Sequence, residues 1–268
     1  MILLITQDFP FSLPVWRILN DTFPTDTTSQ LLLLELRNKD QLRWCALDCE
    51  TGTIRWEKTI QKTTWWTAAI GFFSGILLMH EYAGGGQPAP GKLLAADALT
   101  GEIIWILEGS TFEHTDGVNL QTARRGPEGT STGENRSLKT GLLIDFSSLL
   151  KCVPRTLWQS PTTYPETSQY YSILCRFIEK VTGNTPQKAI IYGEVSGNVL
   201  INYYFYPTDS IILSRSLLVI NSTKTVLLHE TIHSDEVGTV SGDYFYDNRY
   251  IVFLKKIDEI TVIKLPRP

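Results

Sequence analysis

The stretches ALDCETGTIRW at residues 46–56 and AADALTGEIIW at residues 95–105 are two copies of one motif. Both fit the pattern A-x-D-x-x-T-G-x-x-x-W, and their aspartates, Asp48 and Asp97, lie 49 positions apart. Self-similarity at such a period is typical of solenoids, propellers and other repeat arrays. The motif therefore predicts the architecture of the molecule, and it says little about the chemistry.

Each copy has the composition of a β-hairpin. Apolar residues lead to the aspartate, whose carboxylate can accept backbone N–H groups of the turn that follows. The glycine supplies the positive φ at which the chain reverses, and a short β-rich segment comes next. The closing tryptophans, Trp56 and Trp105, are large enough to fill the space between adjacent sheets. Because one hairpin cannot bury its own face, we expect several such units to stack.

The motif resembles the repeat of the quinoprotein-type β-propellers, which carry it at the end of each four-stranded blade. The resemblance implies an all-β propeller. The chain also resembles members of an uncharacterised bacterial family. Quinone-dependent dehydrogenases with this repeat typically hold the cofactor against a pair of adjacent cysteines. The four cysteines of this chain include no such pair; they are Cys45, Cys49, Cys152 and Cys175. We therefore expect no quinone or other cofactor, and we expect free buried thiols.

Three degenerate blade ends are predicted further along the chain, at Asp145, Asn221 and Lys255. The interval between the first two of these is too long by about one helix, and the apolar spacing within residues 166–182 predicts that helix. Its apolar stripe consists of Tyr170, Leu174, Phe177, Ile178 and Val181. Gly183 is expected to end the helix in the left-handed conformation.

The predicted fold is a single all-β domain over residues 1–268, a β-propeller of about five blades with one inserted α-helix at about 166–182. Residues 2–6 are expected to complete the last blade and close the ring. Residues 124–140, which are rich in Gly, Ser and Thr, are predicted to form a long loop. Trp65 and Trp66 are expected on a strand, one in the core and one against a neighbouring blade.

Charge and hydropathy exclude several functions. The net charge is −4, and no basic run exceeds two residues, so nucleic acid is not an expected partner. The apolar N-terminal stretch, residues 1–5, is too short for a signal peptide, and no stretch is long enough for a membrane span. We expect a cytoplasmic location and no membrane contact.

One motif suggests catalysis. His229-Glu230-Thr231-Ile232-His233 matches H-E-x-x-H, which on a helix places two zinc ligands on one face beside a general base. The β-rich residues before it favour a strand, on which positions four apart lie about 13 Å from each other. Two ligands of one zinc ion bind at roughly 2.0–2.1 Å from the metal. We therefore expect no metal site here, and a zinc metallopeptidase is the least favoured alternative.

The remaining evidence favours a non-catalytic binding or scaffold propeller whose ligand, a protein or a small molecule, is unknown. Four aromatic residues around the helical insertion are the predicted binding residues, because exposed Tyr and Trp are enriched at interfaces; they are Trp158, Tyr164, Tyr170 and Tyr171. They could equally cap the hydrophobic end of the ring. An enzyme that acts on a small molecule in the propeller channel is the alternative function.

Overall fold

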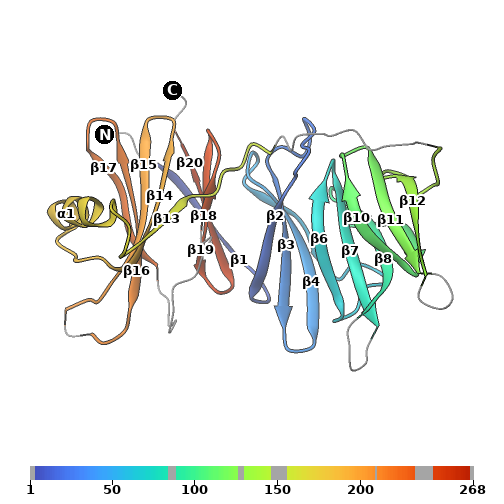
Figure 1. Cartoon of the computed structure of the whole chain (residues 1–268). Coiled ribbons are helices and arrows are strands. Elements are labelled where there is room, and N and C mark those ends of the chain that lie inside the picture. Colours follow the sequence, from blue (N-terminus) through green and yellow to red (C-terminus); the bar gives the residue numbers. More distant parts are fainter. Residues whose placement is uncertain are drawn as a thin grey trace. The chain divides into compact units, whose positions relative to one another are not determined.

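The computed structural model describes residues 4–83, 89–125, 130–145, 156–208, 210–232 and 244–265. These residues form 20 strands in five antiparallel sheets and one α-helix, which confirms the all-β class and the inserted helix (Figure 1). The chain divides into two compact units. We call them the repeat unit, Leu13–Leu157, and the helix unit, Met1–Ser12 with Trp158–Pro268.

The repeat unit contains three sheets, and in each of them the strands follow one another in chain order. The first consists of β2 (Val15–Asn20), β3 (Leu31–Asn38), β4 (Gln41–Asp48) and β5 (Thr53–Lys58). The second consists of β6 (Thr67–Phe73), β7 (Ile76–Ala83), β8 (Ala89–Asp97) and β9 (Ile103–Glu108). The third consists of β10 (Ser110–Thr115), β11 (Asn119–Arg125) and β12 (Ser131–Ser137).

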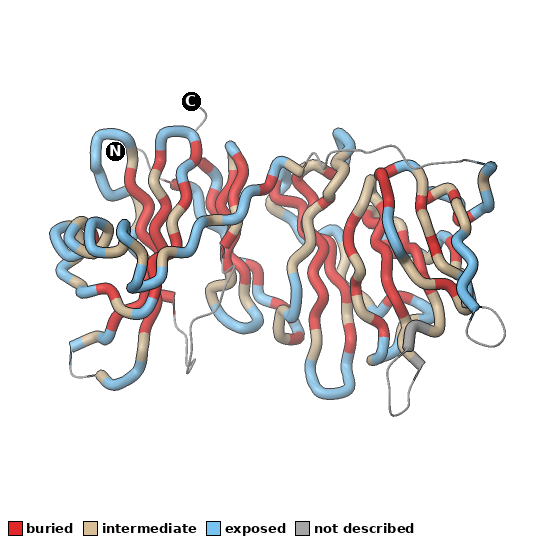
Figure 2. Tube along the Cα trace, viewed as in Figure 1, coloured by how far each residue is buried: buried red, intermediate tan, exposed pale blue. Residues whose placement is uncertain are grey.

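These sheets pack face to face because successive side chains of a strand point to opposite faces. On β7, Leu77 and Met79 join the core against the first sheet, whereas Ile76 and Leu78 join the core against the third. The central strands are therefore buried on both faces, as Figure 2 shows by their colour. Such stacking buries the apolar faces that a single hairpin cannot bury by itself.

The two motif copies form the predicted turn. The Oδ1 atom of Asp48 accepts the N–H groups of Glu50 and Thr51 at 2.9 and 3.1 Å. The corresponding atom of Asp97 accepts two N–H groups, both at 2.9 Å. Gly52 and Gly101 have φ angles of +63° and +69°, which a residue with a side chain rarely adopts.

A third copy begins at Ser137, 40 positions after Asp97, and the prediction of a blade end at Asp145 is wrong. Gly141 donates its N–H to the Ser137 carbonyl at 2.8 Å and has a φ of +69°, as Gly101 does in its turn. The hydroxyl of Ser137 replaces the carboxylate and accepts the Thr140 N–H at 3.3 Å. Because the motif pattern requires an aspartate, it does not match this serine.

The predicted loop at 124–140 is also wrong. Residues 131–137 form β12, which pairs with β11 from Asn119↔Ser137 to Arg125↔Ser131. Polar, glycine-containing strands lack the alternation by which strands are found in a sequence. Residues 126–129 lie outside the described part of the chain.

The motif tryptophans connect each copy to the next one. Trp56 Nε1 donates to the Ala98 carbonyl at 3.1 Å, and Trp105 Nε1 donates to the Leu138 carbonyl at 2.9 Å. A Cβ on Gly141 would lie 2.9 Å from the Trp105 ring, so the glycine also makes room for the indole. The prediction that these tryptophans pack between sheets is confirmed.

The helix unit contains two sheets and α1 (Tyr171–Thr182). One sheet has the order β13-β14-β15-β16-β17, formed by β13 (Thr162–Pro165), β14 (Gln187–Val195), β15 (Asn198–Phe205), β16 (Ser214–Asn221) and β17 (Val226–Ile232). The other has the order β1-β20-β19-β18, formed by β1 (Ile5–Pro10), β18 (Tyr244–Tyr246), β19 (Tyr250–Lys256) and β20 (Glu259–Lys264).

Strand β1 pairs with β20 from Ile5↔Lys264 to Pro10↔Glu259, so the N-terminal segment completes the last sheet, although the strand extends to Pro10, beyond the predicted residues 2–6. Asn221 ends β16, and its Oδ1 accepts the N–H groups of Thr223 and Thr225, which confirms the predicted turn. This turn joins the last two strands of a five-stranded sheet, as the motif joins the last two strands of a four-stranded one. The prediction at Lys255 is wrong. Its turn joins the second and third strands of a sheet, whereas the motif joins the third and fourth.

Helix α1 begins at Tyr171, five positions later than predicted, and Gly183 ends it with a φ of +78°. Its buried residue Ile178 and its half-buried apolar residues pack on the face of β14–β16 that carries Ile190 and Ile201. The other face of that sheet packs on the sheet of β18–β20. The helix therefore covers one face of a sheet, where the repeat unit would place another sheet.

Candidate functional site

The repeat unit carries a surface groove that the sequence did not predict, and we call it the aromatic groove. Its cavity volume is about 370 Å³. The groove is lined by Trp16, Arg17, Glu35, Arg37, Trp65, Trp66, Ala68 and Tyr82. The side chains of Trp16 and Trp66 are 68% and 51% exposed. Two indoles this exposed bury little apolar surface in the fold itself.

A buried carboxylate organises the groove. Glu35 lies on β3 among leucines and is fully buried. Arg37 Nε lies 2.5 Å from Glu35 Oε1, and Arg17 Nε lies 3.8 Å from Oε2. Because a buried charge is costly unless it is paired, both guanidinium groups are held at this point of the sheet.

The two guanidinium groups in turn hold the chain that carries the tryptophans. Arg37 donates to the carbonyls of Trp65, at 2.7 Å, and of Thr67, and its guanidinium carbon lies 4.8 Å from the Trp65 ring centre. Arg17 donates to the Ala69 carbonyl at 2.6 Å. The backbone from residue 65 to residue 69 is therefore fixed before any ligand arrives, which lowers the entropic cost of binding.

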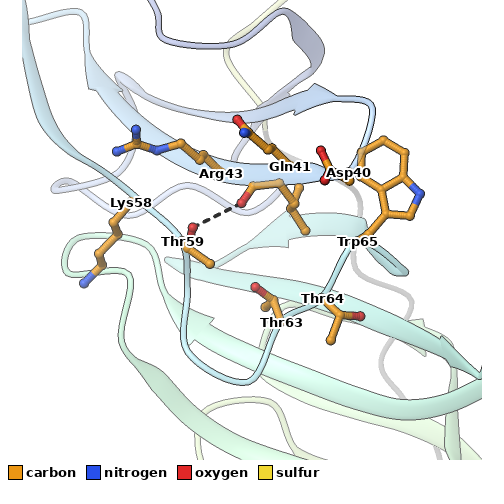
Figure 3. A pocket seen from close by; sticks show the side chains of 9 residues that line it. Asp40, Gln41, Arg43, Lys58, Thr59, Thr63, Thr64 and Trp65 are labelled. Carbon is orange, nitrogen blue, oxygen red and sulfur yellow. Dashed lines mark hydrogen bonds between the residues drawn. The ribbon is translucent and has the colours of Figure 1, made fainter.

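A second cavity of about 460 Å³ adjoins the aromatic groove, and we call it the polar pocket (Figure 3). Trp65 lines both cavities. In Figure 3 the side chains of Trp65 and Asp40 lie together at one end of the pocket, and Lys58 lies at the other end. The pocket is lined by Asp40, Gln41, Leu42, Arg43, Lys58, Thr59, Thr63, Thr64 and Trp65.

The polar pocket has no excess of positive charge. Arg43 Nε lies 3.5 Å from a Glu57 oxygen, and Lys58 Nζ lies 2.5 Å from a Glu102 oxygen. The hydroxyl of Thr59 donates to the Leu42 carbonyl at 3.3 Å. Since both cations are paired, the pocket lacks the concentrated positive surface that phosphates require.

The structure separates the four predicted binding residues. The Tyr164 and Tyr170 rings lie 5.6 Å apart, and Tyr192 lies 6.2 Å from Tyr164; we call these three the tyrosine cluster. Trp158 is buried, and its ring lies 5.1 Å from that of Phe245. Tyr171 begins α1, and burial together with the neighbouring Cys175 thiol raises its pKa. The binding role of these residues stays a prediction.

The first four residues of the H-E-x-x-H match lie on a strand, as predicted. His229 is on β17, and its Nε2 atom lies 2.9 Å from the Tyr203 hydroxyl. Glu230 is 3.1 Å from Lys255 Nζ, and His233 lies outside the described residues. In the described ranges no group of three or more His, Cys, Asp or Glu side chains could hold a metal ion.

The described cysteines are free thiols. Cys45 and Cys49 are buried, which confirms the prediction for these two, and Cys175 is half-buried. Burial raises the pKa of the Cys45 thiol, so it stays protonated and unreactive at neutral pH. Cys152 lies outside the described residues.

The expectation for Trp65 and Trp66 is wrong. Both lie in a turn before β6, which begins at Thr67, and Trp66 faces solvent. The Thr64 N–H donates to the Thr67 hydroxyl at 2.9 Å, a local bond that favours a turn over a strand. The polar residues 61–64 before the tryptophans were the available signal of a turn.

Part of the chain is similar to a protein family whose function is unknown. Residues 25–105 match the model of a domain of unknown function, DUF4905, and this stretch contains both motif copies and much of the aromatic groove. No curated protein matches the chain. Across the described residues no helix has the length and apolarity needed to cross a membrane.

Several solved structures are similar at low identity. A member of the DUF4221 family from Bacteroides vulgatus is 12% identical over 97% of both chains, with a TM-score of 0.35. An uncharacterised protein from Listeria monocytogenes is 10% identical over 93% of this chain and 94% of that one, with a TM-score of 0.35. The Cps50 (Swd1) β-propeller domain of Myceliophteria thermophila is 9% identical over 95% and 97%, with a TM-score of 0.23. The matched family model and the first two structures belong to uncharacterised families.

Proposed function

We propose that this protein is a non-catalytic binding module built as a single β-propeller of five blades, with quinoprotein-type repeats. Five antiparallel sheets, most of them with strands in chain order, support this fold, as does the pairing of β1 with β20. The hydrogen bonds from Trp56 and Trp105 to the following copy supply the contact that repeats between blades. In this fold α1 covers one face of the fourth blade.

The observation that carries the binding function is the aromatic groove. Two exposed indoles stand on a backbone that a buried carboxylate and two guanidinium groups hold in place. Rigid aromatic side chains that expose apolar area are favoured at recognition surfaces. The single carboxylate of the groove, Glu35, is neutralised by Arg17 and Arg37, so it is a poor general base. These features favour binding over catalysis.

A ligand screen tests this function. Purified protein is heated with a panel of peptides, saccharides, nucleotides and lipids, and the ligands that raise the melting temperature are retained. We expect the retained ligands to lose their effect on the double variant Trp16→Ala with Trp66→Ala. The matched control is Tyr164→Ala with Tyr170→Ala in the tyrosine cluster, which should keep the effect.

Two results would contradict the proposed function. If the tyrosine variants lose the ligands and the tryptophan variants keep them, the binding surface is the tyrosine cluster. If a retained ligand is chemically converted on incubation with the protein, the module is an enzyme. Mass spectrometry of the recovered ligand decides the second point.

A further inference from the structure

We propose that the aromatic groove and the polar pocket together bind a neutral oligosaccharide; this inference rests on the proposed binding function and names its ligand class. The two cavities share Trp65, so an extended ligand could occupy both. Each volume, about 370 and 460 Å³, falls within the roughly 300–1,000 Å³ of small-molecule sites. One cavity is aromatic and the other is polar.

The aromatic groove suits the flat faces of sugar rings. A pyranose presents C–H groups on its faces and hydroxyl groups around its edge. The indoles of Trp16 and Trp66 offer exposed aromatic area on which such C–H faces can stack. The guanidinium of Arg37 lies against the Trp65 ring and donates its hydrogen bonds to Glu35 and to backbone carbonyls. These contacts hold Trp65 at the junction of the two cavities.

The polar pocket suits the hydroxyl groups at the edges of a sugar ring. Asp40 in the turn after β3 and Gln41 at the start of β4 are exposed, and their side chains have no hydrogen-bond partner within the described ranges. A carboxylate accepts hydrogen bonds, and an amide both donates and accepts them, as a sugar hydroxyl requires. The hydroxyls of Thr63 and Thr64 donate to the Ile60 carbonyl and to Glu81. The Thr64 hydroxyl also accepts the Trp66 N–H at 3.3 Å, and each hydroxyl keeps a lone pair as an acceptor.

Charge favours a neutral ligand. The two cations of the pocket pair with Glu57 and Glu102, whereas Arg17 and Arg37 share the single carboxylate of Glu35, which leaves one positive charge in the aromatic groove. Asp40 balances that charge, so the two cavities together carry no net charge. A proline-rich peptide would use the aromatic groove but has few side-chain groups to engage Asp40 and Gln41. The oligosaccharide uses both cavities.

The test is calorimetric titration of the full chain with maltohexaose, cellohexaose and chitohexaose, and with decaproline as the competing class. We expect at least one of the hexasaccharides to bind and to quench tryptophan fluorescence. Trp66→Ala and Gln41→Ala should each weaken that binding by about fivefold, because stacking and a hydrogen bond each contribute on the order of 1 kcal/mol. Both residues are exposed, so the fold should be retained, and an unchanged melting temperature verifies this.

Tyr206→Ala, which removes a 48%-exposed aromatic of the helix unit, is the matched control and should bind as the wild type does. Failure of all three hexasaccharides to bind would overturn the inference, and so would binding that Trp66→Ala and Gln41→Ala leave unchanged. Decaproline binding that is lost in Trp66→Ala would also overturn it, yet would leave the proposed binding function standing.

Discussion

At the scale of single residues, Glu35 has the largest effect on the candidate site. It is the one charged residue in the run of leucines that precedes Arg37 on β3. Because it is buried, it pairs with both guanidinium groups. Those groups then hold the carbonyls of residues 65–69. The shape of the aromatic groove therefore depends on one fully buried carboxylate in its lining.

Replacing this carboxylate should loosen the groove. We expect Glu35→Gln to lower the free energy of unfolding by about 3 kcal/mol, because the Arg37 guanidinium, which is only 10% exposed, loses its counter-charge. Urea denaturation measures the loss, and a red shift of tryptophan fluorescence reports the loosened turn. An unchanged midpoint would show that Glu35 does not organise the groove.

Glu134 provides the control for this substitution. It pairs with Arg136 at 2.5 Å on the third sheet and is 15% exposed, against a fully buried Glu35. We expect Glu134→Gln to lower stability less and to leave the fluorescence maximum unchanged.

The motif tryptophans make a graded prediction. Trp105 is 8% exposed and Trp56 is half-buried, so Trp105→Ala should cost about 3–5 kcal/mol of unfolding free energy and Trp56→Ala less. The exposed Trp16 is the control, and its replacement by Ala should change stability by no more than about 0.5 kcal/mol. Chemical denaturation of the three variants checks this order. Equal effects at all three positions would mean that the repeated contact does not stabilise the sheets.

At the scale of elements, His80 joins the second and third sheets. It lies on β7, and its Nε2 atom accepts the Phe112 N–H of β10 at 3.0 Å. Burial lowers the pKa of His80 below its ordinary value of 6.5. The imidazole must stay neutral to accept this bond.

This bond predicts a dependence of stability on pH. The unfolded chain takes up a proton at His80 as the pH falls through about 6.5, whereas the folded chain does so only at lower pH. Stability is therefore full above pH 6.5 and decreases as the pH falls below it. Urea denaturation between pH 7.5 and 5 measures the slope. His80→Gln accepts the same bond without titrating, so its profile should be flatter; an equally steep profile would assign the slope to other groups.

Strand β1 is held to its neighbours by Lys255. Its Nζ atom lies 2.7 Å from Asp8 on β1 and 3.1 Å from Glu230 on β17. The pairs are partly exposed, so we expect Lys255→Met to lower stability by only about 1 kcal/mol, and by less in 1 M salt than in 0.1 M. The salt dependence is the diagnostic measurement. A loss independent of salt would assign it to packing of the side chain.

At the scale of the whole molecule, the sequence predicted the repeated hairpins well. Asp48 and Asp97 revealed them because the turn needs both a side-chain acceptor and a glycine. Ser137 supplies the acceptor as a hydroxyl. A pattern that requires aspartate therefore misses the third copy and points to the unrelated Asp145. The strand at 131–137 was missed because its residues are polar and largely exposed, so they leave no hydrophobic alternation in the sequence.

The candidate site could hardly be predicted at all. Pairing of β2 with β3 places Trp16 and Arg17 near Glu35, whereas Trp65 and Trp66 come from the turn before β6 of the next sheet, which Arg37 holds. The four predicted aromatics gather only in part, since Trp158 is needed for packing on Phe245. Local patterns predict turns and strands, whereas a surface groove is a product of tertiary structure.

The central proposal is that the two compact units belong to one domain of five sheets, and calorimetric unfolding tests it most directly. A single domain predicts one transition whose calorimetric and van't Hoff enthalpies agree. That whole transition should shift to lower temperature both in Trp105→Ala, in the repeat unit, and in Lys255→Met, in the helix unit. Two transitions, each shifted by only one of the two variants, would contradict it.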